Sequence, residues 1–266
     1  MVCKKGFGSV RLMSVGMIIM GLCVGFMVGL TGVGGAALLT PILILLGINP
    51  SVAVGTDLAY NSVTKFFGSV QHWRQKTINL KLMKYLAIGS IPSAILAVGM
   101  LRLFDTFFNN QEDIIKHALG YMLILVAVAT LVKTFMKGRL EFNAMQMKPL
   151  EEKRTLTIVI GAVLGFLVGL TSIGSGSLFA LVMLYLYKMS PTELVGTDIA
   201  HAFFLVTAAG LMHAGIGNID YMLTVNLLIG SIPGVIIGST LSAKIPAKPL
   251  RAIMAVMILL SGLKLI

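Results

Sequence analysis

Charged side chains are scarce in this sequence, and long stretches have none. Of the 266 residues, 12% are Asp, Glu, Lys or Arg and 57% are hydrophobic. No charged residue occurs from Leu12 to Gly47. This composition, with a mean hydropathy of +0.94, excludes an ordinary soluble domain. It predicts an all-α, polytopic bundle of transmembrane helices whose main partner is the lipid bilayer.

Cysteine is nearly absent, and so are the motifs of common enzymes. Cys3 lies in the terminal tail and Cys23 in an apolar stretch, so no disulfide framework or Cys-x-x-Cys metal site is expected. The sequence contains no G-x-x-x-x-G-K-[ST], H-E-x-x-H or G-x-S-x-G. We therefore expect no cofactor, no metal centre, no ATP hydrolysis and no intramembrane enzyme activity.

The net charge of +11 does not indicate nucleic-acid binding, because the basic residues cluster in short connections between apolar segments. Three such clusters fall within 74–84, 133–154 and 244–251. Cytoplasmic loops carry this excess of Lys and Arg, so the clusters predict cytoplasmic connections, with both termini outside.

The second half of the sequence repeats the first. The segment GFMVGLTGVGGAALL, which begins at Gly25, matches GFLVGLTSIGSGSLF, which begins at Gly165. After one inserted residue the offset becomes 141: PSVAVGTDLA from Pro50 matches PTELVGTDIA from Pro191, and GSIP recurs from Gly89 and from Gly230. Internal duplication is a common way to build secondary transporters, with substrate bound between the repeats.

Each half contains five apolar segments. They cover residues 12–30, 36–47, 52–71, 83–101 and 113–135, then 155–171, 177–188, 193–213, 221–243 and 248–266. An odd number of crossings reverses direction, so we predict two inverted five-segment repeats with broken first helices. The repeats cover 1–140 and 155–266 and are joined by a cytoplasmic loop over 141–154. The second segment of each repeat is too short to span hydrocarbon about 30 Å thick.

Glycine and hydroxyl residues interrupt the first apolar segment of each repeat. A break in hydrocarbon leaves backbone groups unpaired unless protein or water satisfies them, and a helix that starts there directs N–H groups at an anion. Two facing breaks would cradle a small anion. The candidate substrate-binding residues are Thr31, Gly32, Gly34, Gly35, Thr171, Ser172, Gly174, Ser175 and Ser177, together with Asn61. Close helix packing through the G-x-x-x-G pattern of Gly25 and Gly29 is the alternative.

Asp57 and Asp198 follow the duplicated VGT in apolar surroundings, where a carboxylate marks a functional site by default. Asn61 shares a helical face with Asp57, and His201 shares one with Asp198. We expect these faces to point inward, with Asp57, Asp198 and His201 as candidates for proton coupling. The alternative is that Thr56 or Asp57 caps a helix N-terminus.

His72 and His213 occupy equivalent positions in the two repeats and are candidates for gating or proton relay. An interfacial position near a span end is the alternative. For Lys65 we favour a structural role, snorkelling or pairing with Asp57. The GSIP motifs predict proline kinks, acting as hinges or in static packing.

Several of these features together resemble the sulfite exporter TauE/SafE family of membrane permeases. They are the glycine-rich break, the GTD of the third segment, a histidine fifteen residues later, the sequence GNID from Gly217 and the duplication. The resemblance covers nearly the whole chain, and the family's glycine-rich segments correspond to 31–35 and 171–177. In the first repeat, TINL from Thr77 departs from the GNID-like pattern.

The resemblance implies a multi-pass protein of a bacterial inner membrane that transports small sulfur-containing anions, such as sulfite, thiosulfate or organosulfonates. Because no ATP-binding motif is present, transport is expected to draw on a gradient, with Asp57, Asp198 or His201 as candidates for coupling a proton. The alternative is a cation or transition-metal transporter using Asp57, Asp198 and His201, although few metal-binding side chains accompany them. The sequence does not indicate an oligomeric state.

Overall fold

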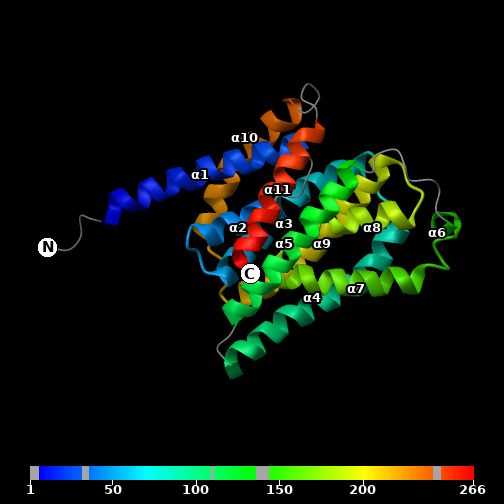
Figure 1. The fold of residues 1–266 in the computed structure, drawn as a ribbon, viewed down its shortest axis with the longest axis horizontal. Helices are drawn as coiled ribbons and strands as arrows, with labels where there is room; N and C mark the ends of the chain where they lie inside the picture. The colour runs from blue at the N-terminus through cyan, green and yellow to red at the C-terminus, as the bar shows by residue number, and fades with distance from the viewer. Residues whose placement is uncertain (1–5, 32–35, 109–110, 136–143, 242–246) are drawn as a thin grey trace.

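A computed structural model describes the chain except residues 1–5, 32–35, 109–110, 136–143 and 242–246 (Figure 1). The described residues form helices and no strand, which confirms the all-α prediction. In chain order the helices are α1 (Gly6–Thr31), α2 (Ala36–Leu45), α3 (Pro50–Arg74), α4 (Leu80–Phe108), α5 (Gln111–Phe135), α6 (Ala144–Met147), α7 (Arg154–Thr171), α8 (Leu178–Leu186), α9 (Pro191–Gly215), α10 (Tyr221–Leu241) and α11 (Ala247–Leu265). Each predicted apolar segment corresponds to one helix, and α6 is an addition in the central connection.

Five segments within the described residues are long and apolar enough to cross a membrane. They are Leu80–Leu103, Asp113–Val132, Arg154–Thr171, Pro191–Gly215 and Tyr221–Leu241. Large apolar side chains also cover the outside of the bundle, including Leu211 (69% exposed), Ile236 (60%) and Leu260 (61%). Since water would penalise such a surface, these faces suit contact with lipid.

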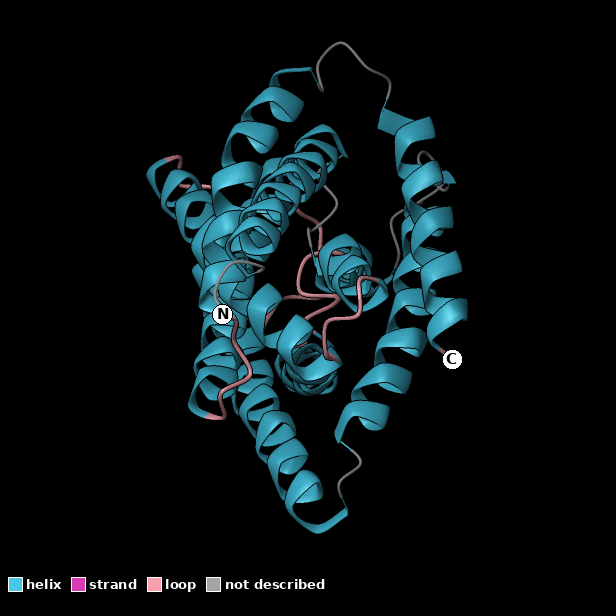
Figure 2. Ribbon diagram, turned by 90° about the vertical axis from the view of Figure 1, so that its left-hand side faces the viewer, coloured by secondary structure: helices cyan, strands magenta, loops and turns pink. Residues whose placement is uncertain are grey.

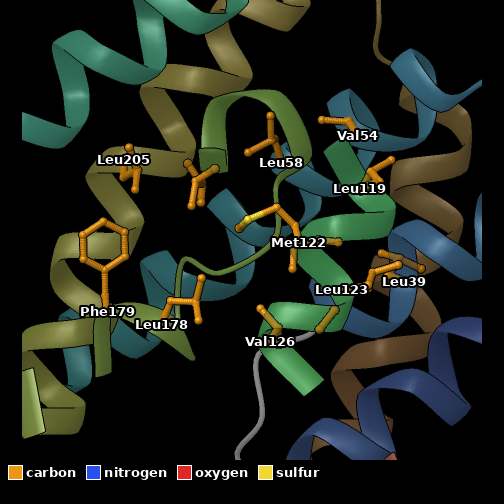
Figure 3. Packing of buried hydrophobic residues seen from close by; sticks show 14 of the residues in the cluster. Leu39, Val54, Leu58, Leu119, Met122, Leu123, Val126, Leu178, Phe179 and Leu205 are labelled. Carbon is orange, nitrogen blue, oxygen red and sulfur yellow. The ribbon is translucent and has the colours of Figure 1, made fainter. Parts of the chain in front are cut away.

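Two short helices, α2 and α8, follow the predicted interruptions. They contain 10 and 9 residues, so they reach roughly 15 Å and 13 Å, about half of a bilayer's hydrocarbon. Their apolar faces belong to the core: Phe179 of α8 and Leu39 of α2 are fully buried. In Figure 3, Met122 of α5 lies between side chains of these two regions.

Helices from the two halves of the chain pack against one another. The most extensive contacts join α1 with α10, α4 with α7, α3 with α9 and α5 with α11; α1 lies along α10 in Figure 1. Under the duplication, α1 corresponds to α7 and α10 corresponds to α4. The same type of contact therefore occurs twice: the first half supplies α1 to one contact and α4 to the other, and the second half supplies the equivalent partners α10 and α7.

Glycine makes these long contacts possible. On α1, Gly21, Gly25 and Gly29 face the backbone of α10, and a Cβ at any of them would collide with it. Gly165 of α7 meets Ser90 of α4 in the same way. Close packing is therefore confirmed as the role of Gly25 and Gly29.

The GSIP motifs contribute to the same contacts. Gly89 approaches the carbonyl oxygen of Ile158, and Gly230 approaches that of Ile18. Pro92 and Pro233 lie inside α4 and α10, respectively. The packing role of these motifs is thus observed, whereas a hinge role stays a prediction.

The central connection is anchored to the end of α8. The Nζ atom of Lys153 donates to the carbonyl oxygens of Met145 (2.9 Å) and Leu186 (2.8 Å) and lies 4.3 Å from the centre of the Tyr187 ring. Burial lowers the pKa of the Lys153 ammonium. The segment before α7 is therefore fastened to the short helix.

Candidate functional site

The interruption between α7 and α8 lies inside the protein. Helix α7 ends at Thr171, Ser172 is left-handed with φ 62°, and Gly174 has φ 99°, which favours glycine. Ser172 and Ser175 are buried. Figure 2 shows loop backbone in the middle of the molecule in this view, with long helices on either side. The predicted break of the first helix is confirmed in the second repeat.

The other predicted residues of the two breaks are placed unequally. Gly32, Gly34 and Gly35 lie outside the described residues, as does the side chain of Thr31. Thr171 closes its own helix, since its Oγ1 donates to the carbonyl oxygen of Leu167 (2.7 Å) and accepts from the Ile173 amide (3.3 Å). Ser177 precedes α8 and makes no side-chain cap bond.

Asp57 is fully buried and accepts hydrogen bonds from three side chains. Its Oδ2 accepts from Thr40 Oγ1 (2.9 Å) and Ser172 Oγ (2.7 Å), and its Oδ1 accepts from Asn61 Nδ2 (2.8 Å). The carboxyl group therefore ties α2 and α3 to the break in the other half of the chain. Asn61, predicted to bind substrate, acts here as a donor to Asp57.

Lys65 reaches the break itself. Its Nζ donates to the backbone oxygen of Ser175 (3.1 Å) and to Ser175 Oγ (3.0 Å). The ammonium also interacts electrostatically with both Asp198 and Asp57. Lys65 was expected to snorkel or pair with Asp57, and sequence reasoning missed its place at the break. The available signal was a lysine among apolar residues one turn beyond Asn61.

His201 lies on α9 beside the same break. It is fully buried, its Nε2 is 2.8 Å from Ser90 Oγ, and its ring centre is 4.5 Å from that of Phe179. The burial of Asp57 and His201 agrees with the prediction that their helical faces point inward. Asp198, which shares its face with His201, is also buried, with 6% of its surface exposed.

The equivalent position in the first repeat is Tyr60, whose side chain lies near that of Ser231. Ser90 and Ser231 are the serines of the two GSIP motifs, so each motif reaches the third helix of the opposite repeat. Sequence reasoning missed the Ser90–His201 bond and the matching approach of Ser231 to Tyr60, although the offset of 141 relates their partners.

The duplicated GTD also joins the two halves. Thr56 Oγ1 accepts from the Asp220 amide (3.1 Å), and Thr197 Oγ1 accepts from the Asn79 amide (2.9 Å). Asp220 and Asn79 are equivalent residues that accept from amides in the first turns of α10 and α4. The cap interpretation of Thr56 and Asp57 is wrong, because α3 begins at Pro50 with Asn49 as its N-cap.

His72 and His213 contact other parts of the protein. His72 Nδ1 lies 2.8 Å from Thr77 Oγ1 in the connection after α3, whereas the fully buried His213 has its Nε2 3.2 Å from the carbonyl oxygen of Gly169. Each of these hydrogen bonds joins a histidine to another segment, and a gating or proton-relay role stays a prediction.

Among the described residues, no group of three or more His, Cys, Asp and Glu side chains is arranged to hold a metal ion. The two buried aspartates instead interact with the Lys65 ammonium. A cation at this centre would have to compete with that lysine, which disfavours the cation-transport alternative.

The lipid-compatible exterior, the membrane-spanning helices and the buried polar centre define a multi-pass membrane protein of the transporter class. The chain belongs to the sulfite exporter TauE/SafE family, whose sequence pattern matches residues 17–265. The predicted family resemblance is thereby confirmed. Because the family and its relatives are membrane transporters, the protein is a transporter and not an enzyme.

Several relatives resemble the chain over most of its length. It is 66% identical over 254 residues to the probable membrane transporter protein YjnA of Bacillus subtilis (strain 168), covering 96% of this chain and 100% of that protein. The probable membrane transporter protein YunE of the same organism is 26% identical over 262 residues, covering 94% and 96%. MJ0441 of Methanocaldococcus jannaschii, also named a probable membrane transporter protein, is 27% identical over 286 residues, covering 99% and 98%. No solved structure matches the chain significantly.

Proposed function

We propose that this protein is a secondary transporter of small sulfur-containing anions such as sulfite, thiosulfate or organosulfonates, and that the α7–α8 break binds the substrate. The observation that carries this proposal is the Lys65 ammonium at the hydroxyl-bearing break, donating to Ser175. A partly buried cation with hydroxyl groups beside it favours an anionic ligand. The name of the family supports sulfite as the first substrate to test.

The charges around Lys65 suggest how anion binding is coupled to protons. Without substrate, the ammonium interacts electrostatically with the carboxylates of Asp198 and Asp57. An arriving anion competes with these carboxylates for Lys65. A carboxylate in apolar surroundings is a candidate proton carrier, so we assign the proton that compensates the charge of the anion to Asp198.

We also propose that the halves, 1–140 and 155–266, are inverted repeats that rock about this centre, with 141–154 as their cytoplasmic connection. The exchanged helix pairs support this, because each half supplies a helix to both long contacts. The Ser90–His201 hydrogen bond and the approach of Tyr60 to Ser231 both cross between halves, so a rocking motion would act on both.

Flux into proteoliposomes tests the proposal. Labelled sulfite, thiosulfate and methanesulfonate are supplied with and without a pH gradient to the wild type, Lys65→Met and Asp198→Asn. The matched control is Lys81→Met, since Lys81 is a surface lysine whose side chain is 77% exposed. We expect Lys65→Met to abolish flux, Asp198→Asn to retain flux without its response to the pH gradient, and Lys81→Met to resemble the wild type.

Two results would contradict the proposal. Undiminished flux of every anion in Lys65→Met would rule out the lysine as the anion-binding group. A pH response that persists in Asp198→Asn would exclude Asp198 as the proton carrier while leaving the anion site intact.

A further inference from the structure

We propose that His201 determines specificity at this site: its Nδ1–H and the Lys65 ammonium bind two oxygen atoms of the same oxyanion. The inference rests on the proposed function, since it names a second group that recognises the transported anion. It predicts that the site distinguishes oxyanions from single-atom anions such as chloride.

The first argument is the hydrogen bonding of the His201 ring. Its Nε2 lies 2.8 Å from Ser90 Oγ. The proposal assigns the donor role to the Ser90 hydroxyl, which places the proton of the neutral ring on Nδ1. Nδ1 is buried, and no described residue hydrogen-bonds to it. Native proteins rarely leave a buried donor without an acceptor, so this atom points to a ligand that supplies one.

The second argument is the position of the ring. Phe179, which His201 contacts at 4.5 Å between ring centres, is the second residue of α8 and follows Ser175 by four residues. Lys65 donates to both oxygen atoms of Ser175 and acts electrostatically on His201. A cation and an unsatisfied donor therefore lie beside the same end of α8.

The chemistry of these two groups is complementary. The ammonium attracts any anion with little directional preference, whereas a ring N–H requires an acceptor along its bond. Sulfite and thiosulfate each present several oxygen atoms, so one molecule satisfies both groups. Chloride offers a single atom and gains less from His201.

The duplication provides an internal control for this role. Tyr60 is equivalent to His201 and lies near Ser231, the equivalent of Ser90. At the position equivalent to Lys65 the second repeat has Val206. A purely structural role would be shared by both Ser pairs, whereas anion recognition needs the lysine and the His201 donor.

The test is calorimetric binding of sulfite and thiosulfate to the purified full-length protein, with chloride measured by competition. His201→Gln retains a group near Nε2 but loses the Nδ1 donor, whereas His201→Asn keeps a donor near Nδ1. We expect His201→Gln to weaken oxyanion binding about ten- to a hundredfold, the range for a lost hydrogen bond to a charged group. Chloride affinity should stay unchanged, and His201→Asn should recover most of the oxyanion affinity.

Tyr60→Phe and Ser231→Ala are the matched controls and should bind sulfite like the wild type. If they weaken binding as much as His201→Gln, or if His201→Gln binds normally while Lys65→Met does not, the assignment to His201 is wrong and the proposed function stands. If Lys65→Met also binds sulfite normally, the proposed function fails.

Ser90→Ala covers the case in which His201→Gln does not fold. It removes the bond to Nε2 and should lower sulfite affinity several-fold with chloride unaffected. Equal loss for sulfite and chloride would overturn the proposal, because it would indicate general damage to the site.

Discussion

Replacing Asp57 should destabilise the protein far more than replacing Asp198, although both aspartates come from the same duplicated motif. Asp57→Ala removes an acceptor that serves Thr40, Ser172 and Asn61 at 2.7–2.9 Å. Ala has no group that can replace the carboxylate. The interaction between α2, α3 and the α7–α8 break is thereby lost.

The size of the effect follows from the buried donors that remain. A hydrogen bond to a charged group contributes about 1.5–3 kcal/mol, and three such bonds lost together are not additive. Removing the carboxylate also removes its desolvation cost, which offsets part of the loss. We therefore expect Asp57→Ala to lower the free energy of unfolding by about 3–5 kcal/mol. That corresponds to roughly 6–20 °C in Tm by the scaling of comparable domains.

The assay is thermal unfolding in detergent, followed by size-exclusion chromatography of the protein that remains monodisperse. Asp198→Asn is the paired variant, and Asp113→Ala, at an exposed carboxylate, is the surface control. We expect a large loss of Tm in Asp57→Ala and small changes in the other two. A Tm for Asp57→Ala equal to that of Asp113→Ala would refute the structural role of Asp57.

Two further predictions concern contacts between the halves. Gly165→Ala should lower the free energy of unfolding by about 1–3 kcal/mol, because its new methyl group collides with the backbone of Ser90. The control is Gly99→Ala, where a Cβ would meet no heavy atom within 4 Å, and it should not destabilise the protein. Thermal unfolding of both variants measures the difference, and equal stability would contradict the close packing. Thr56→Val and Thr197→Val should each cost about 1 kcal/mol by losing the same type of amide bond. A loss in only one of them would show that the two GTD motifs do not play equivalent parts.

Part of the candidate site could be predicted from the sequence. The break at 171–177 was predicted because glycine and serine interrupt an apolar run, and the buried faces of Asp57 and His201 followed from helical periodicity. Lys65 was missed because a single lysine in an apolar segment is compatible with snorkelling. No residue near Lys65 in the sequence indicates a contact with Ser175, which is 110 residues away. Ser90 was missed because its motif was interpreted through its proline alone.

The sequence by itself determined which segments are helices, where the second repeat is interrupted and how the two halves correspond. Those properties depend on local hydrophobic length and on residue order. Only the tertiary structure decided the partners: α1 against α10, Ser172 on Asp57 and Lys65 at Ser175. A glycine stripe permits close approach without selecting the opposing helix. Helices from the two halves meet only when the chain folds. The sequence of one segment therefore does not indicate which distant side chain will contact its charged residue.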